Sequence, residues 1–169
     1  GLYTSDKPIK VYYGGRGGAK STACAEALLV QGMESPLRIL CVREVQKSIT
    51  LSVYSLLKDK ISQHELGGFY TVKSDTIIGK NGTQFFFEGL QNHTVDSLKS
   101  IEKINRCWVE EAHNVTSKSW EILIPSLFRV KDCQLWVTFN TRKVTDPTYI
   151  RFVQNADENR GEMDADTGD

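Results

Sequence analysis

One stretch of the sequence decides the fold: Gly14-Gly15-Arg16-Gly17-Gly18-Ala19-Lys20-Ser21. An apolar run at residues 9–13 precedes it and an Ala- and Leu-rich stretch at residues 21–31 follows, which predicts a strand, a loop and a helix. The pattern G-x-x-x-x-G-K-[ST] is met at Gly14, Lys20 and Ser21, with Ala19 in place of the second glycine. This order of elements is typical of a phosphate-binding loop.

The residue types of this loop suit the phosphates of a nucleotide. Glycines let consecutive backbone N–H groups turn inward at a helix N-terminus, whose dipole also favours an anion. Lys20 would reach the β- and γ-phosphates, and the Ser21 hydroxyl would ligate magnesium. The methyl group of Ala19 is tolerated if its φ is negative. We therefore predict that ATP and Mg²⁺ bind here, with the nucleotide held by Gly14, Gly15, Arg16, Gly17, Gly18, Ala19, Lys20, Ser21 and Thr22.

Two alternatives concern this loop. A glycine-rich turn can also bind nothing, but the strand–loop–helix context and the spacing of the Lys-Ser pair favour phosphate. Arg16 either stabilises charge on the transferring phosphoryl group or faces solvent or the ribose, and the sequence leaves both readings open.

A second apolar strand ends in two carboxylates, in Cys107-Trp108-Val109-Glu110-Glu111. Glu110 stands where P-loop NTPases hold the acid that supports magnesium, and Glu111 is placed to act as the general base on the attacking water. Adjacent strand residues point in opposite directions, so both acids serve one site only if the strand ends there. The alternative is a pair of solvated acids that cap a strand.

The next apolar strand ends in Thr138-Phe139-Asn140. A polar residue at the mouth of a parallel strand is placed to sense the γ-phosphate or to hold the attacking water, which makes Asn140 a candidate. The alternative is a turn-forming asparagine. His64, His93 and His113 have no metal-ligand spacing, although His113 follows the acidic pair closely.

Strands alternate with helices along the chain, which is the pattern of an α/β sheet. We predict a P-loop NTPase fold, with a mainly parallel sheet flanked by helices and a small antiparallel insertion or edge. Strands are expected at residues 38–43, 104–110 and 134–140, and an amphipathic helix from Ile49 to Ile61. Short strands at 69–72, 76–78 and 83–87 form the antiparallel part, with Asn81-Gly82 as a hairpin turn.

Glycine and proline predict where two of the helices end or bend. Gly32 and Pro36 are stop signals for the helix that follows the loop. Pro125 lies inside the helical stripe from Trp120 to Leu127, so a kink or two short helices are expected there.

Length and composition fit one globular domain of 169 residues. Lys plus Arg equals Asp plus Glu, 21 each, so no overall basic field indicates a nucleic-acid partner. The four cysteines lie far apart without metal-ligand spacing, and three of them sit inside apolar runs, so no disulfide framework is expected and a reducing, intracellular compartment fits best. No apolar run is long enough to span a bilayer. Residues 1–154 are predicted to be the ATPase core, and the polar, acidic residues 155–169 a linker that begins a further C-terminal part.

The ordered set of motifs resembles the ATPase domain of phage terminase large subunits, the motors that package viral DNA into procapsids. The resemblance extends from about Tyr12 to Val153, with departures at Ala19 and at Ser100, where such proteins often carry glycine. Besides the loop, the matching pieces are residues 38–44, Ser97-Leu98-Lys99-Ser100, Trp108-Val109-Glu110-Glu111-Ala112, residues 119–125, Thr138-Phe139-Asn140, Asp146-Pro147-Thr148-Tyr149 and Arg151-Phe152.

The resemblance implies specific roles and partners. Arg16 becomes a candidate arginine finger acting in cis, Glu111 the catalytic base, and Asn140 the residue that links hydrolysis to movement. The implied partners are double-stranded DNA, the portal protein, the small terminase subunit, further copies in a ring on the portal, and a C-terminal nuclease domain of the same chain. The implied location is the cytoplasm of the bacterial host. The alternatives are a helicase or recombination-type ATPase, or a nucleotide-dependent assembly switch.

Overall fold

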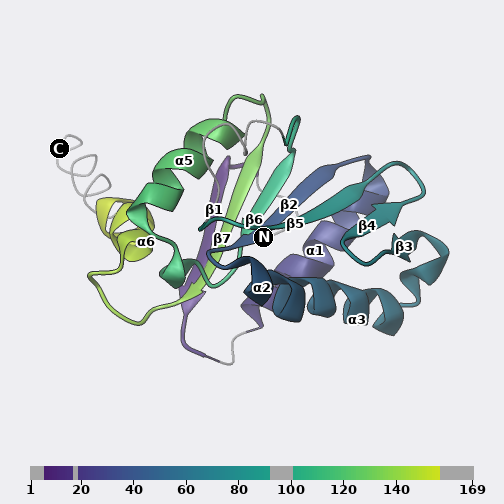
Figure 1. Ribbon diagram of the computed structural model, residues 1–169, viewed down its shortest axis with the longest axis horizontal. Helices are drawn as coiled ribbons and strands as arrows, with labels where there is room; N and C mark the ends of the chain where they lie inside the picture. The colour runs from purple at the N-terminus through teal and green to yellow at the C-terminus, as the bar shows by residue number, and fades with distance from the viewer. Residues whose placement is uncertain (1–5, 17–18, 92–100, 157–169) are drawn as a thin grey trace, which may run out of the picture.

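The computed structural model describes residues 6–16, 19–91 and 101–156. Within these residues a seven-stranded sheet has the order β1-β7-β6-β2-β5-β4-β3, and helices cover both of its faces (Figure 1). The predicted α/β class is confirmed.

Five strands form the parallel part of the sheet, and two strands form an antiparallel edge. The parallel strands are β1 (Ile9–Gly14), β7 (Gln134–Asn140), β6 (Arg106–Val109), β2 (Arg38–Arg43) and β5 (Gln84–Gly89). The edge is formed by β4 (Thr76–Gly79) and β3 (Tyr70–Val72), which run antiparallel to their neighbours. The chain turns from β4 into β5 at Asn81-Gly82, where Gly82 has φ +94°, so the predicted hairpin and antiparallel edge are confirmed.

The helices lie in two layers. On one face lie α1 (Lys20–Glu34) and the run formed by α2 (Gln46–Ile49), the π-helical η1 (Thr50–Tyr54) and α3 (Ser55–Gln63), which ends near the short η2 (Leu66–Gly68). On the other face lie α5 (Ser117–Leu127) and η4 (Ile150–Gln154), with η3 (Ala112–Asn114) and α6 (Pro147–Tyr149) between them. The predicted amphipathic helix is confirmed, because Ile49, Val53, Leu57 and Ile61 are all buried.

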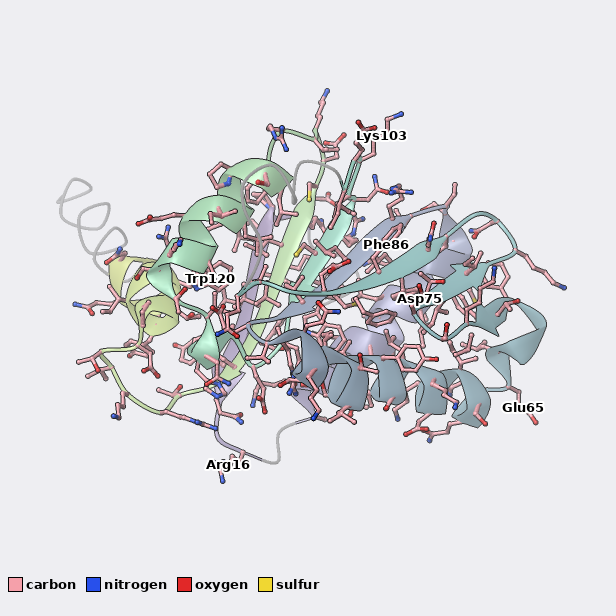
Figure 2. All side chains as sticks on the ribbon, in the orientation of Figure 1. Arg16, Glu65, Asp75, Phe86, Lys103 and Trp120 are labelled. Atoms are coloured by element: carbon pink, nitrogen blue, oxygen red, sulfur yellow. The ribbon has the colours of Figure 1, made fainter. Side chains whose placement is uncertain are left out.

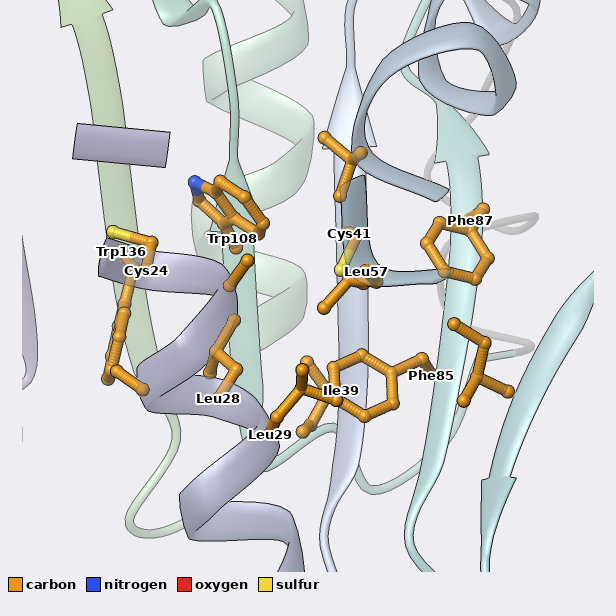
Figure 3. Close-up of a cluster of buried hydrophobic side chains, with 14 of the residues drawn as sticks. Cys24, Leu28, Leu29, Ile39, Cys41, Leu57, Phe85, Phe87, Trp108 and Trp136 are labelled. Carbon is orange, nitrogen blue, oxygen red and sulfur yellow. The ribbon is translucent and has the colours of Figure 1, made fainter. Parts of the chain in front are cut away.

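Strand β2 shows how the sequence builds both layers. Ile39 and Cys41 contribute to the core under α1 and α3, while Leu40 and Val42 contribute to the core under α5. Figure 3 shows the first of these cores, with Trp108 from β6 and Trp136 from β7 beside α1. A nearly continuous apolar run is therefore the pattern of a strand covered on both faces.

The prediction that Gly32 stops the first helix is wrong, because α1 continues to Glu34. A Cβ on Gly32 would lie 2.6 Å from the Tyr70 hydroxyl oxygen and 2.8 Å from Cγ2 of Thr83. Gly32 therefore allows the helix to pack closely on the antiparallel edge. Pro36 does mark the end of the helix, since it favours the extended backbone of Ser35 (φ −152°, ψ 151°), the C-cap residue.

Gly32→Ala is expected to lower the free energy of unfolding by about 1–3 kcal/mol, because the added methyl overpacks the contact with Tyr70 and Thr83. Both neighbours are anchored, since the Tyr70 hydroxyl donates to Leu29 O and the Thr83 hydroxyl donates to Gly32 O, each at 2.6 Å. Helix propensity alone would give the opposite sign, a gain of up to about 1 kcal/mol. Urea denaturation measures the difference, and a stabilised variant would show that the contact relaxes freely.

Gly67→Ala is the matched control for this prediction, because no heavy atom lies within 4 Å of a Cβ at Gly67. Its free energy of unfolding should change by less than about 1 kcal/mol.

Of the two alternatives expected around Pro125, a kink or two short helices, the second is wrong, because α5 is one helix from Ser117 to Leu127. Pro125 lies in its last turn, so it removes a single backbone bond to the carbonyl of the exposed Glu121, where water can replace it. The apolar stripe itself is confirmed, since Trp120, Leu123 and Leu127 are buried. Asn155 and Ala156 continue the C-terminal helix, and the rest of the expected tail lies outside the described residues.

Candidate functional site

The carboxyl ends of four parallel strands gather the candidate residues at one edge of the sheet. Gly14 at the end of β1 is paired with Asn140 at the end of β7, and β6 and β2 end beside them at Val109 and Arg43. Strand β7 lies between the loop strand β1 and the acidic strand β6. Ligands of open α/β sheets bind at this edge.

The start of the loop has the backbone that the sequence pattern requires. Gly14 has φ +154°, which side chains rarely permit, and Ala19 has φ −70°, which fulfils the condition for tolerating its methyl group. Helix α1 begins at Lys20, and its N-cap residue Ala19 has no side-chain acceptor for the first helical N–H groups. An anion at this end of α1 would satisfy those groups. Gly17 and Gly18 lie outside the described residues.

Lys20 and Ser21 turn their polar atoms toward the loop and the acidic strand. The Lys20 ammonium donates to the carbonyl of Gly15 at 2.9 Å, which holds the lysine over the loop. The Ser21 hydroxyl donates to Oε1 of Glu110 at 2.9 Å. The next residue of the predicted set, Thr22, lies in the first turn of α1 and is partly buried. The hydrogen bond from Ser21 joins the phosphate loop to the acidic pair across 89 residues of sequence.

The two acids meet one arginine that the sequence analysis missed. Arg43 Nε lies 2.5 Å from Glu110 Oε2, and its Nη1 lies 3.4 Å from Glu111 Oε2. Strand β6 ends at Val109, and Glu111 has a left-handed backbone (φ 50°, ψ 45°). Because the strand ends before the two acids, their side chains need not point in opposite directions, and both can serve one site. The sequence feature that could have indicated Arg43 is its position at the end of a predicted parallel strand.

A Mg²⁺ ion would find suitable donors here. Glu110 is 9% exposed, and its Oε1 and the Ser21 hydroxyl are hard oxygen ligands of the type that Mg²⁺ prefers. Among the described residues no group of three or more His, Cys, Asp or Glu side chains could hold a metal ion. Mg²⁺ usually keeps few protein ligands and takes the rest from phosphates and water, which the pair Ser21 and Glu110 would suit.

Asn140 and Arg16 flank this group. Asn140 is partly buried where β7 ends, opposite Gly14. The preceding residues are fixed by packing, since the Trp108 indole donates to the Thr138 hydroxyl at 2.9 Å and Phe139 stacks on Tyr13 with ring centroids 5.7 Å apart. Arg16 is exposed, and Figure 2 shows its side chain extending away from the body of the domain.

His113 lies buried in the turn after the acidic pair. It is 8% exposed, and neither ring nitrogen has a hydrogen-bond partner among the described residues. Burial, with Arg142 nearby, lowers the pKa of His113 below its ordinary value, so the ring is neutral at pH 7.

The family described as phage terminase large subunit matches residues 6–168, nearly the whole chain. The chain belongs to the phage terminase large subunit family. The large terminase subunit of Bacillus phage SPP1 is 28% identical over 127 residues, which are 72% of this chain and 30% of that protein. The chain thus spans about a third of the length of the curated relatives that it matches.

Solved structures of other phage proteins show the same fold. The large terminase of the thermophilic bacteriophage D6E, in complex with ADP, aligns with a TM-score of 0.71 at 14% identity, covering 90% of this chain and 39% of that one. The N-terminal domain of the DNA packaging ATPase from bacteriophage phi29 aligns with a TM-score of 0.68 at 16% identity, covering 90% of this chain and 86% of that one. Family and fold together identify the chain as part of a phage large terminase that has the fold of the N-terminal domain of the phi29 packaging ATPase.

Among the described residues, none of the helices is both long enough and apolar enough to cross a membrane. All four cysteines of the terminase chain are buried and carry free thiols.

Proposed function

We propose that this terminase chain hydrolyses ATP and couples the reaction to the translocation of double-stranded DNA into a procapsid. The observation that supports this most strongly is the continuous polar contact from Ser21 through Glu110 and Arg43 to Glu111. It places a phosphate-loop hydroxyl, two carboxylates and a guanidinium at one edge of the sheet. These are the groups that phosphoryl transfer to water requires.

The phosphate loop binds the nucleotide. Loop amides and the N-terminus of α1 take the phosphates, and the Lys20 ammonium leaves the Gly15 carbonyl for the β- and γ-phosphates. Ser21 and Glu110 would hold Mg²⁺, which neutralises charge on the phosphate oxygens when bound.

Glu111 acts as the general base. It takes a proton from the attacking water as the water oxygen bonds to the γ-phosphorus, and the bond from that phosphorus to the bridging oxygen breaks to give ADP and phosphate. Arg43 neutralises and orients the two acids, because its guanidinium group contacts both carboxylates. Asn140 lies where β7 ends, between the loop strand and the acidic strand. It is the candidate that couples the presence or loss of the γ-phosphate to movement of the motor.

The proposed partners follow from the family. They are the portal protein, the small terminase subunit, other copies of the chain in a ring on the portal, and a C-terminal nuclease domain of the same protein, all in the cytoplasm of the bacterial host. Residues 1–154 are proposed to be the ATPase core of this assembly, and residues 155–169 the start of the connection to the nuclease domain.

Arg16→Ala is expected to lower the turnover number at least tenfold while changing ATP affinity by less than about threefold. The side chain is exposed in the structure, and a contact with the phosphoryl group would form mainly in the transition state. Steady-state kinetics, combined with a titration of a non-hydrolysable ATP analogue, separate the two effects. Equal losses of turnover and affinity would make Arg16 a ground-state binding residue, and unchanged turnover would assign the finger to another residue.

The packaging function is tested by what stimulates hydrolysis in the full-length protein. We expect ATP turnover to rise when procapsids with portals and linear double-stranded DNA are both present. Stimulation by forked DNA without procapsids would instead favour a helicase, and nucleotide binding without turnover would favour an assembly switch.

A further inference from the structure

The turn that carries Glu111 has a backbone that needs support. Glu111 is one of the few described non-glycine residues with a left-handed backbone, and such residues persist only where their surroundings hold them. Its own carbonyl accepts from the Asn114 amide at 3.1 Å, which closes a single turn of 3-10 helix. One short turn of this kind is a weak restraint for a catalytic side chain.

A buried hydrogen-bond chain holds this turn from α6. The Thr148 hydroxyl donates to the carbonyl of Ala112, the residue after Glu111, at 2.5 Å. The Trp120 indole in turn donates to the Thr148 hydroxyl at 2.8 Å. An indole N–H can only donate, so the single proton of the hydroxyl is directed toward Ala112. Thr148 and Trp120 are both fully buried, where water cannot substitute for these bonds.

The anchoring residues are fixed by their own packing. Trp120, which Figure 2 labels on α5, meets the Phe152 ring edge-on, with centroids 4.9 Å apart. The Ala112 carbonyl also accepts from the Val115 amide at 3.1 Å, so both of its lone pairs are used. The position of the peptide next to Glu111 is therefore set by a side chain from α6, 36 residues further along the chain.

We propose that Thr148 is a positioning residue for hydrolysis, which holds the Glu111 carboxylate at the attacking water through the Ala112 carbonyl. The inference rests on the proposed role of Glu111 as general base. The hydrogen bonds of the Thr148 side chain reach Trp120 and Ala112 and not the loop or the two acids, so its substitution should leave nucleotide binding unchanged. A displacement of about 1 Å at a reacting group can cost on the order of a hundredfold in rate.

The test compares Thr148→Val, which keeps the side-chain size but removes the hydroxyl, with Thr148→Ser, which keeps the hydroxyl, in the full-length protein. For Thr148→Val we expect the turnover number to fall by about ten- to a hundredfold, with ADP affinity within about twofold of the parent. Thr148→Ser should recover most of the turnover. In a Glu111→Gln background, Thr148→Val should cause no further loss, because the base that it positions is already absent.

Thr83→Val is the matched control, because its buried hydroxyl also donates to a carbonyl, that of Gly32. Thr83 precedes β5 at the amino edge of the parallel strands, whereas Glu111 follows β6 at their carboxyl edge. Thr83→Val should lower the melting temperature without changing turnover per folded molecule. If Thr148→Val behaves in the same way, or if Thr148→Ser loses as much turnover as Thr148→Val, Thr148 has a structural role only and the proposal is wrong.

Amide hydrogen exchange separates this proposal from the proposed function. The Asn114 and Val115 amides should exchange at least tenfold faster in Thr148→Val than in the parent, whether or not the protein hydrolyses ATP. Unchanged exchange at both amides would overturn the role of Thr148 directly. Faster exchange in Thr148→Val, together with a parent protein that has no ATPase activity, would instead contradict the function of Glu111 and leave Thr148 as the support of the turn.

Discussion

Glu111→Gln is expected to lower ATP hydrolysis by roughly two to four orders of magnitude, the usual contribution of general-base catalysis. Glutamine keeps nearly the same shape and can still accept a hydrogen bond from Arg43, but it cannot take a proton from water. Nucleotide affinity should change little, because Lys20, Ser21 and Glu110 remain in place. Single-turnover hydrolysis, measured together with an ADP titration, separates chemistry from binding.

Glu110→Gln and Glu121→Gln are the controls for this prediction. Glu110 accepts from Ser21, so its substitution should raise the Mg²⁺ concentration needed for hydrolysis as well as lower the rate. Glu121 is exposed on α5, and its substitution should change neither quantity. If Glu111→Gln hydrolyses ATP at the parental rate while Glu110→Gln does not, the two carboxylates have the opposite roles. If neither substitution matters, the acidic pair only caps the strand.

Lys20→Ala is expected to weaken nucleotide binding by about 2–5 kcal/mol, the usual cost of removing one partner from a hydrogen-bonded charge pair. This corresponds to a loss of affinity of roughly 30-fold to several thousandfold. The fold should survive, because the hydrogen bond from Lys20 to the Gly15 carbonyl is exposed and contributes little. Calorimetric titration with ADP measures the affinity, and the thermal melt confirms the fold.

Lys47→Ala is the matched control for Lys20→Ala, because Lys47 is exposed on α2 and makes no predicted contact with the nucleotide. Its ADP affinity should equal that of the parent. A folded Lys20→Ala variant with unchanged affinity would show that the glycine-rich loop does not bind the phosphates.

The sequence predicts the buried strands well, because their residues are apolar on both faces. The bounds of β2 and β7 agree with the predicted ranges, and the Asn81-Gly82 turn correctly placed the antiparallel edge. The β6 prediction began two residues early at Ile104, since apolar residues that pack at a strand end look like the strand itself. Local patterns are most reliable where burial alone determines them.

Contacts between distant segments were not predictable in the same way. Arg43 meets the acidic pair because β2 lies next to β6 in the sheet, and no local pattern gives the order of strands. The prediction that Gly32 ends the first helix was wrong for the same reason, because the role of Gly32 depends on its contact with Tyr70 and Thr83 from the antiparallel edge. The residue types of a site can be predicted from motifs, but their electrostatic partners depend on topology.

The most direct test of the central claim is phosphate release from ATP by the full-length protein, measured with Mg²⁺ and again after chelation. We expect release to continue over many turnovers with Mg²⁺, to stop on chelation, to be strongly reduced in Lys20→Ala and to be nearly absent in Glu111→Gln. Stoichiometric nucleotide binding with no release above the Glu111→Gln level would contradict hydrolysis, and would make the chain a nucleotide-dependent switch.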